Sequence, residues 1–255
     1  MTDMIDMLLN KYGLFLLVLL RTSGIFIVSP FFSAQNIPNV IKIGFTVFTS
    51  IIITLVLDVD VQAIEISLLA LIAKELMIGM TIGFICYLFA STFYTMGQIV
   101  DMSMGFGMVN VVDPQNRIQV PLMGNFYYIL AFLLLLGTNG HHLIIRVLVD
   151  SYNFIPIGNF EFNKNIAFFL VDILARTFTI GFLLSTPIII SIFLLDLVLG
   201  ILTRTIPQLN IFVVGLPLKV FVGLLLMLVT VPIFGTIVSN LMSLMSEKIY
   251  ELFRM

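Results

Sequence analysis

The sequence has few charged residues. Charged side chains make up 10% of the 255 residues, whereas hydrophobic ones make up 60% and the mean hydropathy is +1.16. A soluble globular domain carries roughly 25% charged residues, so this chain lacks the charge needed to cover a surface that faces water. The scarcity excludes an ordinary soluble domain and predicts an integral membrane protein or a part of an apolar assembly. A net charge of −2 is too small to indicate a protein that binds nucleic acid.

Cysteine, histidine and the common catalytic motifs are also scarce. Cys86 is the only cysteine, so a disulfide within the chain is excluded. His141 and His142 are adjacent, and no cluster of acids or cysteines accompanies them, so we expect no metal site and no cofactor. A helix start, a tight turn or an interface is the favoured role for this pair. The sequence lacks G-x-S-x-G, H-E-x-x-H and phosphate-binding loops, and we predict that the protein is not an enzyme.

Long apolar runs are what the sequence does contain. About six segments are strongly apolar: 7–32, 40–57, 66–97, 124–149, 166–203 and 218–246. About 20 residues cross ~30 Å of hydrocarbon as a helix, and the backbone there must satisfy its own hydrogen bonds. The segments lack the alternating pattern of membrane β-strands. The predicted fold class is therefore all-α, with about six long apolar helices, and the acidic N-terminus predicts no removable signal.

A break from Gly97 to Gly124 separates the third and fourth apolar segments. Gly105 and Gly107 flank Phe106 in it, and methionines lie on both sides. Glycine permits backbone angles that other residues avoid, and methionine fills irregular gaps without fixing one packing. We therefore expect a segment that can seal a passage and still be displaced, and we take it as the functional centre.

Several ionisable side chains fall inside the apolar segments. They are Arg21, Lys74, Glu75, Asp172, Arg176 and Asp196. Such groups usually face protein or a water-filled cavity and are candidates for a functional site. Asp172 and Arg176 are four residues apart and can pair on one helix. Two interpretations stay open: pairing between helices or subunits, which we favour, and a proton relay.

The third segment carries a stripe with a four-residue spacing. Glu75, Gly79, Gly83 and Tyr87 would lie on one face of a helix. Small residues at this spacing let two membrane helices approach closely. The favoured interpretation is a packing face between helices.

The last two segments predict a kinked helical hairpin around Thr203 to Leu218. The expected turn residues are Pro207, Gln208, Asn210 and Pro217. Pro187 and Pro232 lie at nearly the same number of residues from Asn210, one on each arm. Because a proline removes a backbone hydrogen bond and kinks a helix, we expect both arms to bend at a common height.

Several strings of residues, in this order along the chain, resemble those of one family. They are Arg21-Thr-Ser-Gly-Ile-Phe with Pro30-Phe-Phe, Asn139-Gly-His-His, Ile155-Pro-Ile-Gly, and Ile206-Pro-Gln-Leu-Asn-Ile-Phe with Gly215-Leu-Pro-Leu-Lys. The chain is similar to the FliR/SpaR/YscT family of type III secretion export-gate proteins over nearly its whole length. The resemblance implies a component of the core export gate, in a flagellar rather than a virulence-type system, that forms and closes the channel for unfolded export substrates.

The resemblance also implies an organisation and a set of partners. It divides the chain into a FliP-like helical part over 1–165, with the loop 97–124, and a FliQ-like kinked hairpin over 166–255. It implies one copy of this chain in a hetero-oligomer with FliP-like and FliQ-like membrane subunits, near FlhB-like and FlhA-like export components. The implied location is the bacterial cell membrane at the flagellar basal body, partly lifted out of the bilayer. A pore plug is implied at Gly105, Phe106, Gly107, Met108, Val109, Asn110 and Val111.

Two rival functions are consistent with the composition. One is a proton-coupled secondary transporter or ion channel that uses Glu75, Asp172 and Asp196. Such a protein often shows two related halves, and residues 1–128 show no convincing repeat in 128–255. The other rival is a passive scaffold that nucleates its partners without lining a pore.

Overall fold

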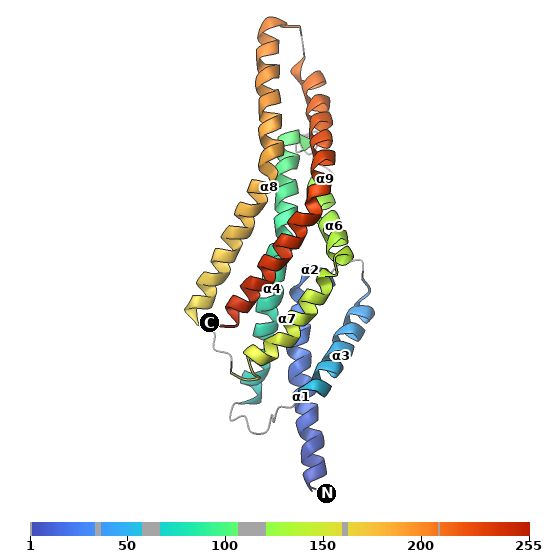
Figure 1. The fold of residues 1–255 in the computed structure, drawn as a ribbon, viewed down its shortest axis with the longest axis vertical. Coiled ribbons are helices and arrows are strands. Elements are labelled where there is room, and N and C mark those ends of the chain that lie inside the picture. Colours follow the sequence, from blue (N-terminus) through green and yellow to red (C-terminus); the bar gives the residue numbers. More distant parts are fainter. Residues whose placement is uncertain (1, 34–36, 58–66, 107–120, 160–162, 209) are drawn as a thin grey trace. The chain divides into compact units, whose positions relative to one another are not determined.

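The computed structural model describes residues 2–33, 37–57, 67–106, 121–159, 163–208 and 210–255. The elements are α1 (Thr2–Val28), α2 (Pro30–Ser33), α3 (Asn39–Val56), α4 (Leu68–Met104), α6 (Leu122–Gly137), α7 (Gly140–Phe154), α8 (Lys164–Thr205) and α9 (Ile211–Leu252) (Figure 1). Over these ranges the chain contains helices and no strand, which confirms the predicted all-α class.

The helices have the length and composition of membrane spans. Five of them, α1, α3, α4, α8 and α9, are long and apolar enough to cross a bilayer. The pair α6 and α7 makes a sixth candidate, broken by a bend of 73°. The prediction of about six long apolar helices is thus confirmed in number.

The fourth predicted apolar segment, 124–149, contains two helices, α6 and α7. Asn139 adopts a left-handed conformation with φ 59° between α6 and α7, and His141 and His142 follow in the first turn of α7. Asparagine visits this conformation more readily than most residues, so Thr138-Asn139-Gly140 can end one helix and start the next. The two histidines accordingly lie at a helix start, one of the roles expected for them.

The break predicted at Gly97 also begins later than expected. α4 continues through Met104, and α6 begins at Leu122. Gly97 is helical and packs on Gly124, where a Cβ atom would collide with the backbone of Met123 and Gly124. A close helix contact, and not a loop, therefore explains this glycine.

Contacts group the chain into two compact units. One consists of Met1–Leu88, Asn139–Ile173 and Ser243–Met255, and the other of Phe89–Thr138 and Leu174–Met242. Three long helices, α4, α8 and α9, contribute residues to both units. The division expected at 165/166 rests on family relationship, which these contacts do not address, and it stays a prediction.

In the first unit, α3 has an inverted amphipathic pattern. Its buried side packs on α1 and carries Thr46, Thr49 and Ser50, whose hydroxyls all bond to carbonyls of their own helix. Its outer side is apolar, with Leu55 and Val56 both strongly exposed. Small polar residues inside and large apolar ones outside suit a helix that faces hydrocarbon or another apolar protein surface, because water would favour the opposite arrangement.

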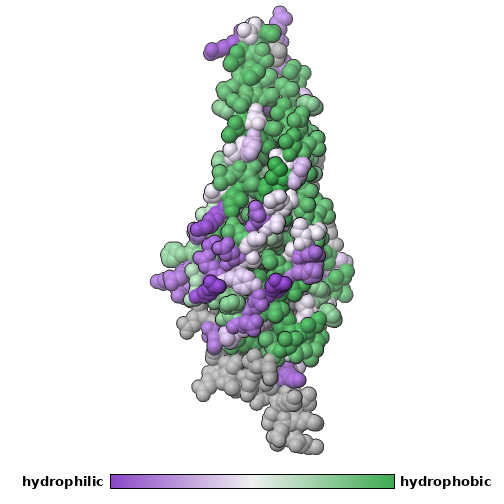
Figure 2. All heavy atoms as spheres, in the orientation of Figure 1, coloured by the Kyte–Doolittle hydropathy of each residue, from purple (hydrophilic) through white to green (hydrophobic). Residues whose placement is uncertain are grey.

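In the second unit, α8 and α9 form a hairpin with largely uncovered arms. Pro207, Gln208 and Asn210 lie in the turn, whereas Pro217 lies inside α9, which corrects its assignment to the turn. Only 22% of the α8 span and 17% of the α9 span are buried within the chain. Figure 2 shows mainly apolar side chains over the part of the arms next to the turn, and hydrophilic ones at the turn itself.

Both arms of the hairpin change direction along their length (Figure 1). Pro187 lies inside α8 and Pro232 inside α9, and each helix continues through its proline. A proline leaves one carbonyl of the preceding turn without its usual donor. That the two prolines set the bends at a common height stays a prediction.

Candidate functional site

A fully buried arginine forms a charged centre in the first unit. The side chains of Arg21 in α1 and Glu75 in α4 are both 0% exposed, and Arg21 Nε donates to Glu75 Oε2 at 2.7 Å. Its Nη1 donates to Ser151 Oγ at 3.2 Å, and its Nη2 donates to the carbonyl of Ile155 at 3.1 Å. The guanidinium carbon lies 4.2 Å from the centre of the Tyr152 ring. Each nitrogen of this buried charge therefore has a partner, as low-dielectric surroundings require.

Glu75 and Lys74 hold the loop that follows α7. The amide of Gly158 donates to Glu75 Oε1 at 3.2 Å, and Lys74 Nζ donates to the carbonyl of Gly158 at 3.0 Å. Gly158 has φ 86°, a conformation that favours glycine. The structure thus brings together the strings that begin at Arg21 and Ile155, which lie far apart in the sequence.

A glycine seam allows α1 and α4 to approach at backbone distance. A Cβ atom on Gly79 would collide with the carbonyl oxygen of Arg21, and one on Gly83 would lie 3.0 Å from the carbonyl oxygen of Ile25. The predicted packing face is therefore confirmed at both glycines. Tyr87 does not belong to this seam: it is 49% exposed and stacks on Phe84.

The remaining predicted charges lie in other surroundings. Lys74 is half-buried, whereas Asp172, Arg176 and Asp196 are exposed in this chain. Asp196 Oδ1 forms an ion pair with Lys219 Nζ at 2.6 Å, and this pair links the two arms of the hairpin. The assignment of all these groups to interfaces stays a prediction.

A second polar site, in the other unit, was missed by the sequence interpretation. Asp101 is buried, and both of its carboxylate oxygens accept a hydrogen bond from the amide of Met123 at 3.0 Å. One of them also accepts the amide of Gly124 at 3.2 Å. Asp101 thus caps the start of α6 from the last turns of α4. An acid near the start of the predicted break was the available signal, because carboxylates favour helix N-termini.

The end of α4 also contacts α9. The buried side chain of Met104 fills the space beside Gly223, where a Cβ atom would collide with it. Gly105 follows with φ 87°, so the chain leaves the helix through a conformation that suits glycine. Of the predicted plug, Gly105 and Phe106 are described, whereas Gly107, Met108, Val109, Asn110 and Val111 lie outside the described residues.

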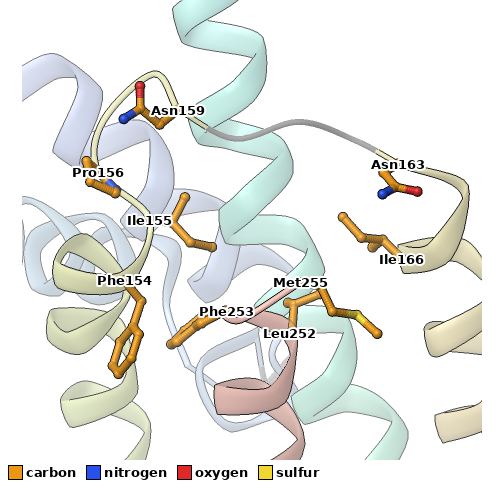
Figure 3. Close-up of a pocket in the computed structure, with 9 residues that line it drawn as sticks. All are labelled: Phe154, Ile155, Pro156, Asn159, Asn163, Ile166, Leu252, Phe253 and Met255. Atoms are coloured by element: carbon orange, nitrogen blue, oxygen red, sulfur yellow. The ribbon is translucent and has the colours of Figure 1, made fainter.

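A pocket of ≈ 310 Å³ in the first unit lies between the ends of α7 and α9 (Figure 3). It is lined by Phe154, Ile155, Pro156, Asn159, Asn163, Ile166, Leu252, Phe253 and Met255. None of these nine side chains is an acid, a base or a nucleophile, so the pocket offers no catalytic group. Over the described part of the chain, no three His, Cys, Asp or Glu residues gather in a way that could hold a metal ion.

Beside this pocket, Tyr250 of α9 donates its hydroxyl to Asp150 Oδ2 at 2.5 Å. Replacing Tyr250 with phenylalanine should lower the free energy of unfolding by about 1 kcal/mol, since a hydrogen bond is lost and the ring is kept. Thermal unfolding in detergent measures this change. Tyr87→Phe is the matched control, because that ring is exposed and its stacking on Phe84 survives. Equal unfolding temperatures for the two variants would contradict the prediction.

Comparison with known proteins gives these features their context. A model of the family described as bacterial export proteins, family 1, matches residues 12–245. The flagellar biosynthetic protein FliR of Bacillus subtilis (strain 168) is 36% identical over 251 residues, which cover 96% of this chain and 96% of that protein. FliR of Escherichia coli (strain K12) is 31% identical over 236 residues, covering 92% and 90%.

The apolar helices and the family match together define a helical membrane protein of bacterial protein export. The chain belongs to family 1 of the bacterial export proteins. Its relatives identify it as a membrane-bound component of flagellar type III protein export, and they give no support to the transporter alternative.

Proposed function

We propose that this chain forms part of the core export gate and closes the channel for unfolded export substrates. The observation that carries the proposal is the α4–α6 junction. Asp101 bonds to Met123 and Gly124 and thereby fixes the two ends of the Gly- and Met-rich segment close together. A segment held at both ends can occupy a narrow passage and return to it after displacement.

The residues assigned to the plug suit a seal that deforms. Phe106, Met108 and Val109 are apolar, and apolar side chains at a constriction can gate by excluding water. Methionine is flexible, and each contact of a loose seal contributes only about 0.1–0.2 kcal/mol per atom pair. Such a seal can part for a polypeptide and close again, whereas a salt-bridged plug would be displaced more slowly.

The surface of the chain supports assembly with other membrane subunits. The α8 and α9 arms are long, apolar and mostly uncovered within the chain. We propose that FliP-like and FliQ-like subunits cover them in a hetero-oligomer with one copy of this chain, next to FlhB-like and FlhA-like components. The proposed location is the flagellar basal body. A passive scaffold would use the same surfaces but would not need a deformable segment at the α4–α6 junction.

Deleting Phe106–Val111 should leave assembly of the gate intact and raise its ion leakage. The helices on both sides of the deletion, α4 and α6, keep their contacts through Asp101 and Gly97, so the partner surfaces stay in place. Conductance of reconstituted gate complexes measures the leakage.

A second variant of unchanged length, with glycine and serine in place of the six residues, controls for shortening of the chain. It should leak as well, because polar side chains hold water in the passage. A deleted gate that assembles and conducts no more than the intact one would show that this segment is an interface and not a plug.

A further inference from the structure

Asp101 is a buried charge that lies outside the charged centre of the first unit. It lies near the end of a long apolar helix, and its carboxylate accepts hydrogen bonds from two backbone amides of α6. Burying a carboxylate is unfavourable unless hydrogen bonds compensate for the lost hydration. Its position therefore calls for a role that an apolar residue could not fill.

We propose that Asp101 is a positioning residue of the gate, whose carboxylate holds the start of α6 against the last turns of α4 and so keeps the closed gate tight. The inference rests on the proposed function, since it takes the α4–α6 junction to lie at the gate. It goes further because it names one carboxylate, that of Asp101, as the group that holds the gate in its closed position.

The start of α6 cannot supply this acceptor itself. The first amides of a helix lack partners within the helix, and the residue before α6 is Pro121, which makes no side-chain cap. Met123 and Gly124 are both buried, so bulk water is a poor substitute for Asp101. Without the carboxylate, two buried donors would lose their acceptor, and the junction would loosen or admit water.

A second contact extends the effect of Asp101 to the hairpin. Met104 lies three residues further along α4 and therefore on a neighbouring part of the same helix face. Its side chain fills the space beside Gly223 of α9. The last turn of α4 is thus joined to α6 by hydrogen bonds and to α9 by packing. A loosened Asp101 junction would leave the packing contact alone to position the end of α4.

The test uses three variants of the full chain in the assembled gate complex. Asp101→Ala removes the acceptor, and Asp101→Asn keeps one neutral acceptor oxygen. Ser103→Ala is the matched control, because Ser103 lies in the same turn and its hydroxyl donates within α4, to the carbonyl of Ile99. Hydrogen exchange at the amides of Met123 and Gly124 reports the junction, and conductance per assembled complex reports the seal.

We expect exchange at these two amides to accelerate about ten- to hundredfold in Asp101→Ala, as loss of a hydrogen bond to a charged group predicts. Asp101→Asn should lie between it and the intact chain, and Ser103→Ala should match the intact chain. Conductance should rise in the same order while the yield of complex is unchanged. A merely structural role would instead lower the yield and leave the conductance of the remaining complexes unaltered, which would overturn the proposal.

The outcome separates this inference from the proposed function. If deletion of Phe106–Val111 raises conductance and Asp101→Ala does not, the role of Asp101 is refuted and the plug stands. If Asp101→Ala raises conductance and the deletion does not, the plug assignment is refuted and the role of Asp101 stands. If neither variant leaks although both complexes assemble, both proposals are refuted.

Discussion

Replacing Arg21 with alanine should destabilise the protein more than any other single loss of charge. The substitution leaves Glu75 fully buried without its cationic partner, and it removes the donors to Ser151 and the carbonyl of Ile155. Breaking a buried ion pair by removing one partner typically lowers stability by about 3–5 kcal/mol. We expect a large loss of folded protein, measured as membrane yield and as thermal unfolding in detergent.

Two further variants separate the charge from the packing at this centre. Arg204→Ala removes an arginine that is exposed in the last turn of α8, and it should change stability little. Arg21→Met combined with Glu75→Leu removes both charges and keeps comparable volume, so it should recover part of the loss. The recovery should be incomplete, because Gly158 loses its acceptor as well. If Arg21→Ala is as stable as Arg204→Ala, the charged centre does not hold these elements together.

Replacing Gly79 with alanine should have the second-largest effect. The new methyl group would collide with the carbonyl oxygen of Arg21, which is backbone and cannot rotate away as a side chain could. Overpacking usually lowers stability by about 1–3 kcal/mol, and we expect a loss at the upper end because α1 and α4 must separate. Thermal unfolding and membrane yield measure this loss of stability. Because the displaced backbone is that of Arg21, the charged centre should be weakened as well.

Gly44→Ala is the control for the change from glycine to alanine itself. Gly44 lies in α3 of the same unit, and apart from the backbone of its own helix no described atom lies within 4 Å of the position its Cβ would take. Alanine is favoured over glycine inside a helix by roughly 0.5–1 kcal/mol, so this variant should be at least as stable as the intact chain. A similar loss at both positions would show that the close approach at Gly79 is not the cause.

The sequence by itself determined the class of fold and the place of its close contacts. Hydropathy over a window of residues is a local property that can be read from the sequence. In hydrocarbon the backbone must satisfy its own hydrogen bonds, so an apolar segment of this kind forms a helix. The four-residue spacing of Gly79 and Gly83 likewise defines a helix face without knowledge of the partner. The sequence pattern could not show that Gly97 is helical, because glycine is favourable both in loops and at close helix contacts.

Only the tertiary structure decided which polar groups meet. The buried ion pair joins Arg21 and Glu75, which lie 54 positions apart, so no rule of local spacing could have indicated it. Asp101 of α4 caps α6, the helix on the other side of the predicted break, and its nearest hydrogen-bond partner lies 22 positions away. A partner across the fold depends on which helix faces meet and at what height, and neither quantity is encoded in a local pattern. The buried charges of this protein therefore acquire their partners through packing of the helices.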